Sequence, residues 1–152
     1  MTTTLVTVLE HARKERDLVL AALRRAEEQE RRLRAQAEQL VTYRGEYQQR
    51  WSAQFSRSGT SEIVQCYRSF MERLDEANHQ QHGMASSAGA QCQELRERVL
   101  AAETRVASVQ KLIERRSLEH RRAQSAREQR QTDESAQQRP RQRLGDTVSA
   151  PL

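Results

Sequence analysis

The chain has 152 residues, with 26 Lys and Arg against 21 Asp and Glu, and a net charge of +5 at neutral pH. Hydrophobic residues make up 36% and aromatic residues 4%, which is too little for a layered globular core but enough for a narrow seam between long helices. The longest apolar run, Leu18 to Leu23, is far shorter than the roughly 20 residues of a transmembrane helix. Because the sequence also shows no secretory signal, we expect a cytoplasmic chain with no direct membrane insertion.

A first periodic segment follows three threonines that are suited to a helix N-cap. Steps of four and three residues alternate from Leu5 to Trp51, over about seven heptads, as in a coiled coil, and a last step of four reaches Phe55. The segment predicts a helix over about residues 5–55. Its expected buried series is Leu5, Leu9, Ala12, Arg16, Val19, Leu23, Ala26, Glu30, Leu33, Ala37, Leu40, Arg44, Tyr47, Trp51 and Phe55.

The periodicity stops at residues 56–61, a cluster of Ser, Gly, Thr and one Arg between two strongly periodic segments. Such a cluster predicts a turn. Either Thr60 or Ser61 is suited to cap the helix that follows.

A second helix is predicted over about residues 62–138, ended by Pro140, with a disordered tail over residues 139–152. One pair of steps in its series is irregular, from Met84 to Ala88 to Cys92, and indicates a stutter in the supercoil. The expected buried series is Ile63, Tyr67, Phe70, Leu74, Ala77, Gln81, Met84, Ala88, Cys92, Leu95, Val99, Ala102, Val106, Val109 and Ile113.

The two series are in register when the chain is folded back at the turn. The residue numbers of facing pairs, such as Trp51 with Tyr67 or Leu33 with Met84, add up to 117 or 118 in every layer. The predicted fold is therefore all-α, a long antiparallel two-helix coiled-coil hairpin that is monomeric alone. The alternative is two separate helices that each dimerise with another chain. Layers near the turn are large, whereas the middle layers are small or polar.

The sequence offers no constellation for catalysis. His79 and His82 lie three residues apart and could form half of a metal site, but no further ligand completes it. Cys66 and Cys92 would lie about 39 Å apart on one helix, too far for a disulfide, so both are expected to be free. No Gly-rich phosphate loop occurs. We predict no catalytic residue, no metal and no cofactor, and therefore no enzyme.

One aromatic residue, Tyr43, falls outside the buried series. It either covers the edge of the hairpin or belongs to an apolar patch for a protein partner. The patch would consist of Leu40, Tyr43, Tyr47, Phe70, Leu74 and Ala77.

The C-terminal part of the second helix extends beyond the first helix as a basic overhang. Residues 111–143 hold ten Lys and Arg against five Asp and Glu. A solvated helix face, a protein-binding element or a nucleic-acid-binding helix would each account for it, but the overhang has no aromatic residue and no known reader motif for nucleic acid. Its candidate binding residues are Arg115, Arg116, Arg121, Arg122, Arg127 and Arg130.

Three stretches resemble the FliJ family of the flagellar type III export apparatus and, more distantly, the YscO-like stalk proteins of injectisomes. They are Leu40–Tyr47, Tyr67–Leu74 and Arg127–Ala136, the last of which is similar to the family's signature of basic, Glu, Gln and basic residues followed by Asp-Glu. The resemblance implies a fold like the central stalk of rotary ATPases and a non-enzymatic role in flagellum assembly and motility. A generic coiled-coil scaffold or an export chaperone is the alternative.

The resemblance also implies partners and a location. The expected partners are the hexameric export ATPase, the cytoplasmic domain of the transmembrane export gate and the export chaperones, with no nucleic acid. The location is the cytoplasmic face of the inner membrane. On this basis the patch around Tyr43 is assigned to the export gate, and the arginines of the overhang to the ATPase ring.

Overall fold

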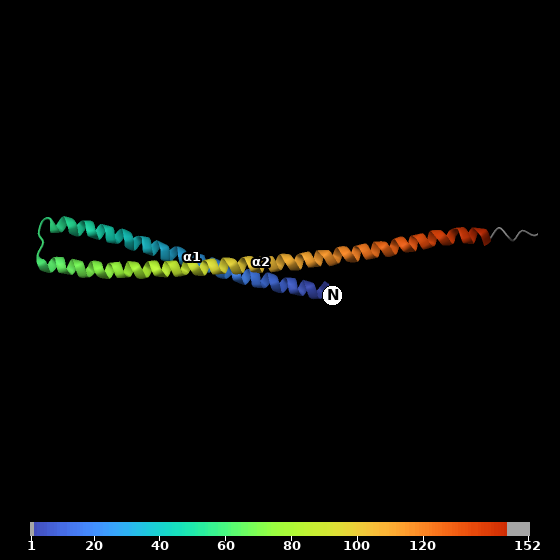
Figure 1. Cartoon of the computed structure of the whole chain (residues 1–152), viewed down its shortest axis with the longest axis horizontal. Coiled ribbons are helices and arrows are strands. Elements are labelled where there is room, and N and C mark those ends of the chain that lie inside the picture. The colour runs from blue at the N-terminus through green and yellow to red at the C-terminus, as the bar shows by residue number, and fades with distance from the viewer. Residues whose placement is uncertain (1, 146–152) are drawn as a thin grey trace, which may run out of the picture. The chain divides into compact units, whose positions relative to one another are not determined.

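The computed structural model describes the backbone of residues 2–145 and the side chains of residues 3–138. Helix α1 spans Thr2–Phe55 and helix α2 spans Ser61–Gly145, and no strand occurs in the described residues (Figure 1). The predicted all-α fold is confirmed. Contacts divide the chain into a hairpin unit, His11–Arg105, and a terminal unit, formed by Met1–Glu10 and Val106–Leu152.

In the hairpin unit, the two helices run antiparallel and pack against each other. Near the turn the rings of Tyr47 and Phe70 have centroids 4.4 Å apart. Further along, Arg105 Nη1 of α2 lies 3.0 Å from Glu15 Oε2 of α1. Pairs 23 and 90 residues apart along the sequence meet in this way only in a hairpin formed within one chain, so the predicted hairpin is confirmed over this unit.

The predicted seam is confirmed in α1, where every residue of the series is buried or half-buried. In α2 one position is wrong: Met84 is 53% exposed, whereas Ala85 is buried. The helical period decides which side chain faces the partner helix, and one residue corresponds to about 100° of rotation. When Ala85 replaces Met84 in the series, the step from Gln81 to Ala85 is four residues and that from Ala85 to Ala88 is three. The two consecutive steps of four then run from Ala77 through Gln81 to Ala85, instead of from Met84 through Ala88 to Cys92.

Backbone hydrogen bonds close both sides of the turn. The amide of Ser58 donates to the carbonyl of Gln54 at 3.0 Å, and the amide of Arg57 donates to the same oxygen at 3.1 Å. On the other side, the amide of Val64 donates to the carbonyl of Thr60 at 3.2 Å. Because its carbonyl accepts the first intrahelical bond, Thr60 is the N-cap of α2, which decides between the two predicted caps.

Helix α2 continues through Pro140 to Gly145, so the predicted end at about residue 138 is wrong, as is the predicted disorder of residues 139–145. A proline inside a helix removes one backbone hydrogen bond and costs about 3 kcal/mol. The exposed residues before it leave the carbonyl of Ala136 open to water, and Arg and Gln are good helix formers. The predicted disorder of residues 146–152 lies outside the described residues.

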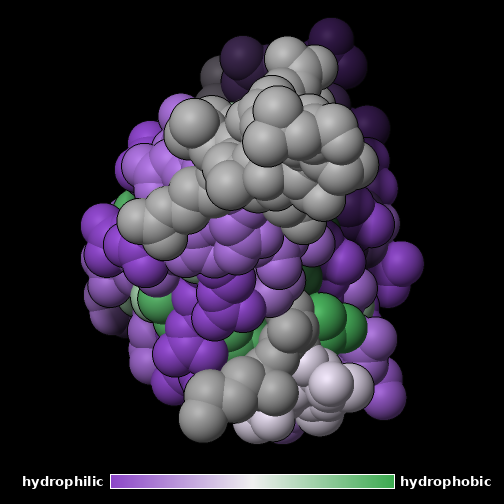
Figure 2. Space-filling view, turned by 90° about the vertical axis from the view of Figure 1, so that its right-hand side faces the viewer, coloured by the Kyte–Doolittle hydropathy of each residue, from purple (hydrophilic) through white to green (hydrophobic). Residues whose placement is uncertain are grey.

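The terminal unit contains a short continuation of the seam followed by an unpaired helix. Leu5, Leu9, Val109 and Ile113 are half-buried. Every residue from Glu114 to Gln138 is exposed, which confirms the predicted overhang. The face drawn in Figure 2 is mostly hydrophilic, with hydrophobic residues visible in small patches. No helix of the described part is long and apolar enough to cross a membrane.

Candidate partner-binding sites

All six aromatic side chains of the protein form one connected cluster in the hairpin unit. Helix α1 presents four of them at steps of four residues, so they lie on one face, and α2 adds two from the opposite side. Ring centroids of contacting pairs lie 4.4–5.8 Å apart, in the range of favourable ring pairs. The members are Tyr43, Tyr47, Trp51, Phe55, Tyr67 and Phe70.

The structure separates the predicted patch residues by exposure. Leu74 is buried and belongs to the core, and Leu40, Tyr47, Phe70 and Ala77 are half-buried. Tyr43 is 47% exposed, and its ring stacks on that of Tyr47 with centroids 5.8 Å apart. Tyr43 therefore lies outside the seam, as the sequence predicts, and is the member of the patch that offers most surface to a partner.

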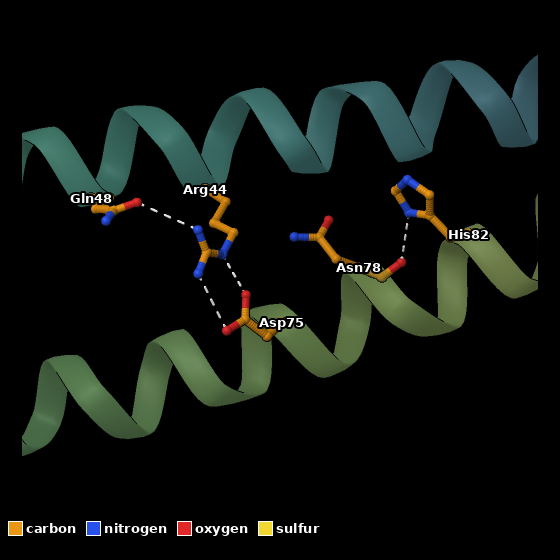
Figure 3. Close-up of polar contacts among 5 residues, drawn as sticks. All are labelled: Arg44, Gln48, Asp75, Asn78 and His82. Carbon is orange, nitrogen blue, oxygen red and sulfur yellow. Dashed lines mark hydrogen bonds and ion pairs between the residues drawn. The ribbon is translucent and has the colours of Figure 1, made fainter.

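An ion pair links the two helices beside this patch (Figure 3). Arg44 Nε donates to Asp75 Oδ1, and Arg44 Nη2 lies 3.4 Å from Asp75 Oδ2. The bond from Arg44 lowers the pKa of Asp75, and the carboxylate in turn raises the pKa of Arg44. Arg44 follows Tyr43 and Asp75 follows Leu74 in the sequence, so the pair fixes the two sides of the patch relative to each other.

Asp75 is the positioning residue that sequence reasoning did not identify. A signal for it was present, because the predicted register places the charged seam residue Arg44 opposite Leu74, and an acidic residue follows Leu74 directly. A charged side chain in a coiled-coil seam commonly reaches a neighbouring residue of opposite charge at the edge of the facing helix.

A polar segment of α2 follows the patch. The Gln81 amide donates to Gln36 Oε1 at 3.0 Å and to the carbonyl of Leu33 at 3.4 Å, both on α1. His82 Nδ1 donates to the carbonyl of Asn78 at 2.9 Å, as Figure 3 shows. The side-chain oxygen of Asn78 is buried and has no hydrogen-bond partner among the described residues. The two Gln81 contacts link α2 to α1 and so help to fix the register. No group of three or more His, Cys, Asp and Glu in the described chain could hold a metal ion.

The middle layers contain a half-buried acid and a buried thiol. The Glu30 side chain is 13% exposed, and Arg34 Nη2 lies 2.7 Å from its Oε1. Gly89 makes room for it, because a Cβ at residue 89 would come within 3.3 Å of the same oxygen. Cys92 is 0% exposed, and burial, with a hydrogen bond to Glu30, raises the pKa of its thiol. Both cysteines are free, as predicted, and Cys66 is exposed.

The six predicted arginines of the overhang are all exposed, and none forms an ion pair within the described part of the chain. Their distribution is uneven. Residues 114–122 hold four arginines against two glutamates, whereas residues 127–134 hold two arginines against three acidic residues. Among these six arginines, the excess of positive charge therefore lies in the first turns of the unpaired helix; three further arginines, Arg139, Arg141 and Arg143, follow in the sequence.

The paired helices, the single aromatic cluster and the unpaired extension of α2 define an all-α antiparallel two-helix coiled coil. The sequence model of the family described as flagellar FliJ protein matches residues 1–145. The chain belongs to the FliJ family, as its sequence motifs predict, and is a component of flagellar type III protein export; the family is non-enzymatic. Neither the comparison with curated proteins nor that with solved structures gives a match.

Proposed function

We propose that this protein couples the hexameric export ATPase to the cytoplasmic domain of the transmembrane export gate during secretion of flagellar subunits. It does so without catalysing a reaction, as a peripheral protein at the cytoplasmic face of the inner membrane, and it also contacts export chaperones. Family membership supports the setting, and two surfaces of the chain support the two contacts.

The unpaired stretch of α2 is the observation that carries the proposal. Residues 114–138 are exposed throughout, and a helix of about 25 residues extends for about 38 Å. Such an element suits the central channel of a protein ring. Its leading arginines, Arg115, Arg116, Arg121 and Arg122, have no partner within the described chain and complement an acidic lining, chiefly through association rate and specificity.

The patch around Tyr43 is the proposed contact with the export gate. Tyr43 is exposed but rests on Tyr47, which in turn contacts Phe70. A ring that is supported on one face and exposed on the other loses little side-chain freedom on binding, which favours its use as an anchor.

Deletion of residues 114–152 tests the ATPase contact. We expect the shortened chain to fold as a hairpin and to bind the gate domain normally, but to lose binding to the ATPase and stimulation of ATP hydrolysis. Replacement of the four leading arginines by Gln should weaken ring binding and flatten its salt dependence. Full binding and stimulation by the shortened chain would overturn the assignment of the overhang.

Tyr43→Ala tests the gate contact separately. Because Tyr43 lies outside the seam, the helix content and thermal unfolding of the variant should remain close to those of the wild type, while affinity for the purified gate domain falls about tenfold or more. Leu100→Ala, also at an exposed apolar residue, is the matched control and should bind the gate normally. If Tyr43→Ala reduces only stability, the residue merely covers the edge of the hairpin.

A further inference from the structure

A groove follows one flank of the hairpin unit, away from the aromatic cluster. Its volume is about 910 Å³, and residues of both helices line it. Its apolar wall consists of Ala22, Ala26, Leu33, Met84, Ala88 and Leu95.

The groove exists because the seam is thin there. Ala26 and Ala88 occupy seam positions with a single methyl group each, and they leave the flank unfilled. Gly83 widens the same wall, since a Cβ added at this residue would meet nothing within 4 Å. Met84, rotated out of the seam, exposes 53% of its surface along the groove. A mostly exposed methionine beside small apolar residues is a flexible surface for a partner.

Polar residues give the two edges of the groove different character. On the α2 side, the edge residues Gln80, Ser87 and Gln91 are uncharged. On the α1 side, Arg25 lines the groove, and Arg24 lies with it in the adjoining hollow. Neither arginine forms an ion pair with any described residue. Glu28 shares that hollow but pairs with Arg31 and Arg32, so the α1 edge carries an excess of positive charge.

The opposite flank is different. There Glu27 pairs with Arg96 at 3.5 Å, and Glu30 pairs with Arg34 at 2.7 Å. These two acidic side chains are paired within the protein, so they offer little to a partner. The contrast singles out the apolar groove as the flank with unused binding capacity.

We infer that this groove binds a third helix, supplied by a partner protein, which is amphipathic and acidic along one edge. Its small or aliphatic stripe packs between α1 and α2 in the manner of a helix seated in a groove. Its acidic edge faces Arg24 and Arg25, and its other edge faces the neutral side of α2. The contact covers about three turns, because Ala22 to Leu33 extends for about 17 Å. The inference is independent of the two contacts proposed above.

Labelled helical peptides test the inference with the full-length protein. The probe has an alanine and leucine stripe, glutamates along one edge and glutamines along the other; two counterparts carry lysines or glutamines in place of the glutamates. Binding is followed by fluorescence anisotropy. We expect the glutamate peptide to bind at least tenfold more tightly than the lysine peptide, with the glutamine peptide between them.

Three variants locate the binding. Met84→Arg should weaken binding of the glutamate peptide at least tenfold. Leu100→Arg, at a 65% exposed leucine of the same helix outside the groove, should leave this binding unchanged. The double variant Arg24→Glu and Arg25→Glu should reverse the preference toward the lysine peptide. All four positions are exposed, so the thermal unfolding curves should match that of the wild type.

Several results would overturn the inference. They are no binding of the glutamate peptide at millimolar concentration, equal binding to the Met84 and Leu100 variants, or no change of preference on charge reversal. Sedimentation of the unliganded protein tests whether a second copy of the chain occupies the groove. If the protein self-associates and Met84→Arg abolishes this self-association, the inference of a different partner protein is overturned.

Discussion

Residues 43–55 and 67–70 of the hairpin unit are held by contacts between large rings, whereas residues 26–30 and 85–92 are held by small side chains and polar contacts. Both regions follow the same seam. The difference shows that periodicity determines which residues face inward, while side-chain size determines how strongly each layer holds. The region of large rings provides stability. The region of small side chains, called the thin region below, leaves open surface along its flanks.

The largest effect is expected in hydrogen exchange. Amides near Tyr47 and Phe70 should exchange slowest, those of the middle layers faster, and those of residues 114–138 faster by several orders of magnitude, because exposed unpaired helix opens readily. Mass spectrometry of the exchanging protein would resolve the three groups. Uniform protection along α1 and α2 would contradict the comparison.

Removal of a ring should destabilise the hairpin more than a change in the thin region. Phe70→Ala deletes a half-buried ring that contacts Tyr47 and should lower the free energy of unfolding by about 3 kcal/mol. Ala26→Gly removes one methyl group and should cost about 1 kcal/mol, mainly through helix propensity. Chemical denaturation measures both. Equal losses would mean that the rings contribute no more than the small layers.

Thiol chemistry compares the same two regions without mutation. Cys66 is exposed and should react with iodoacetamide at a rate typical of an open thiol. Cys92 is buried, and its raised pKa leaves less thiolate at neutral pH, so its rate should be at least tenfold lower. Mass spectrometry of the alkylated peptides gives both rates. Comparable rates would show that the middle of the hairpin is open in solution.

The glycines of α2 sharpen the picture of the thin region. Gly83→Ala meets nothing and should stabilise the helix by about 0.5–1 kcal/mol. Gly89→Ala should stabilise the protein less, because its Cβ would lie 3.3 Å from the Glu30 carboxylate oxygen. Thermal unfolding of the two variants, with Gly45→Ala as the control in open space on α1, measures the difference. An equal gain at residue 89 would show that Glu30 moves aside freely.

The smallest effect concerns the Arg44–Asp75 pair. The pKa of Asp75 is lowered from the ordinary value of 3.8, so the pair contributes stability above that value and loses it as the pH falls through the lowered pKa. Asp75→Asn should reduce stability slightly at neutral pH, and its difference from the wild type should shrink in acid. A difference independent of pH would exclude the ion pair as its cause.

Much of the fold follows from the sequence because a heptad seam has few degrees of freedom. The register that pairs Trp51 with Tyr67 and the turn at Thr60 both follow from spacing and composition. Met84 was wrongly predicted to lie in the seam because it is larger and more apolar than its neighbour Ala85. The helical period, and not hydrophobicity, decides which of the two side chains faces α1. The predicted end of α2 was wrong because the penalty of Pro140 was given more weight than the good helix formers, Arg and Gln, that flank it.

The sites were less predictable than the fold. Spacing identified Tyr43 as a residue outside the seam, but only the structure shows that it rests on Tyr47. The groove beside Met84 had no sequence signal, because it arises from what small residues on both helices leave unfilled. Asp75 required the register to be known before its partner, Arg44, could be assigned.

The position of the single tryptophan makes the protein its own optical reporter. Trp51 lies between Phe55 and Tyr47 on α1 and contacts Tyr67 of α2. Excitation energy absorbed by the neighbouring tyrosines passes to one indole, and its emission wavelength reflects the polarity around that ring alone. Intrinsic fluorescence therefore follows the turn-proximal layers, while circular dichroism follows both helices along their length. A lag between the two signals during heating would separate loss of the thin layers from release of the ring cluster, with no label attached.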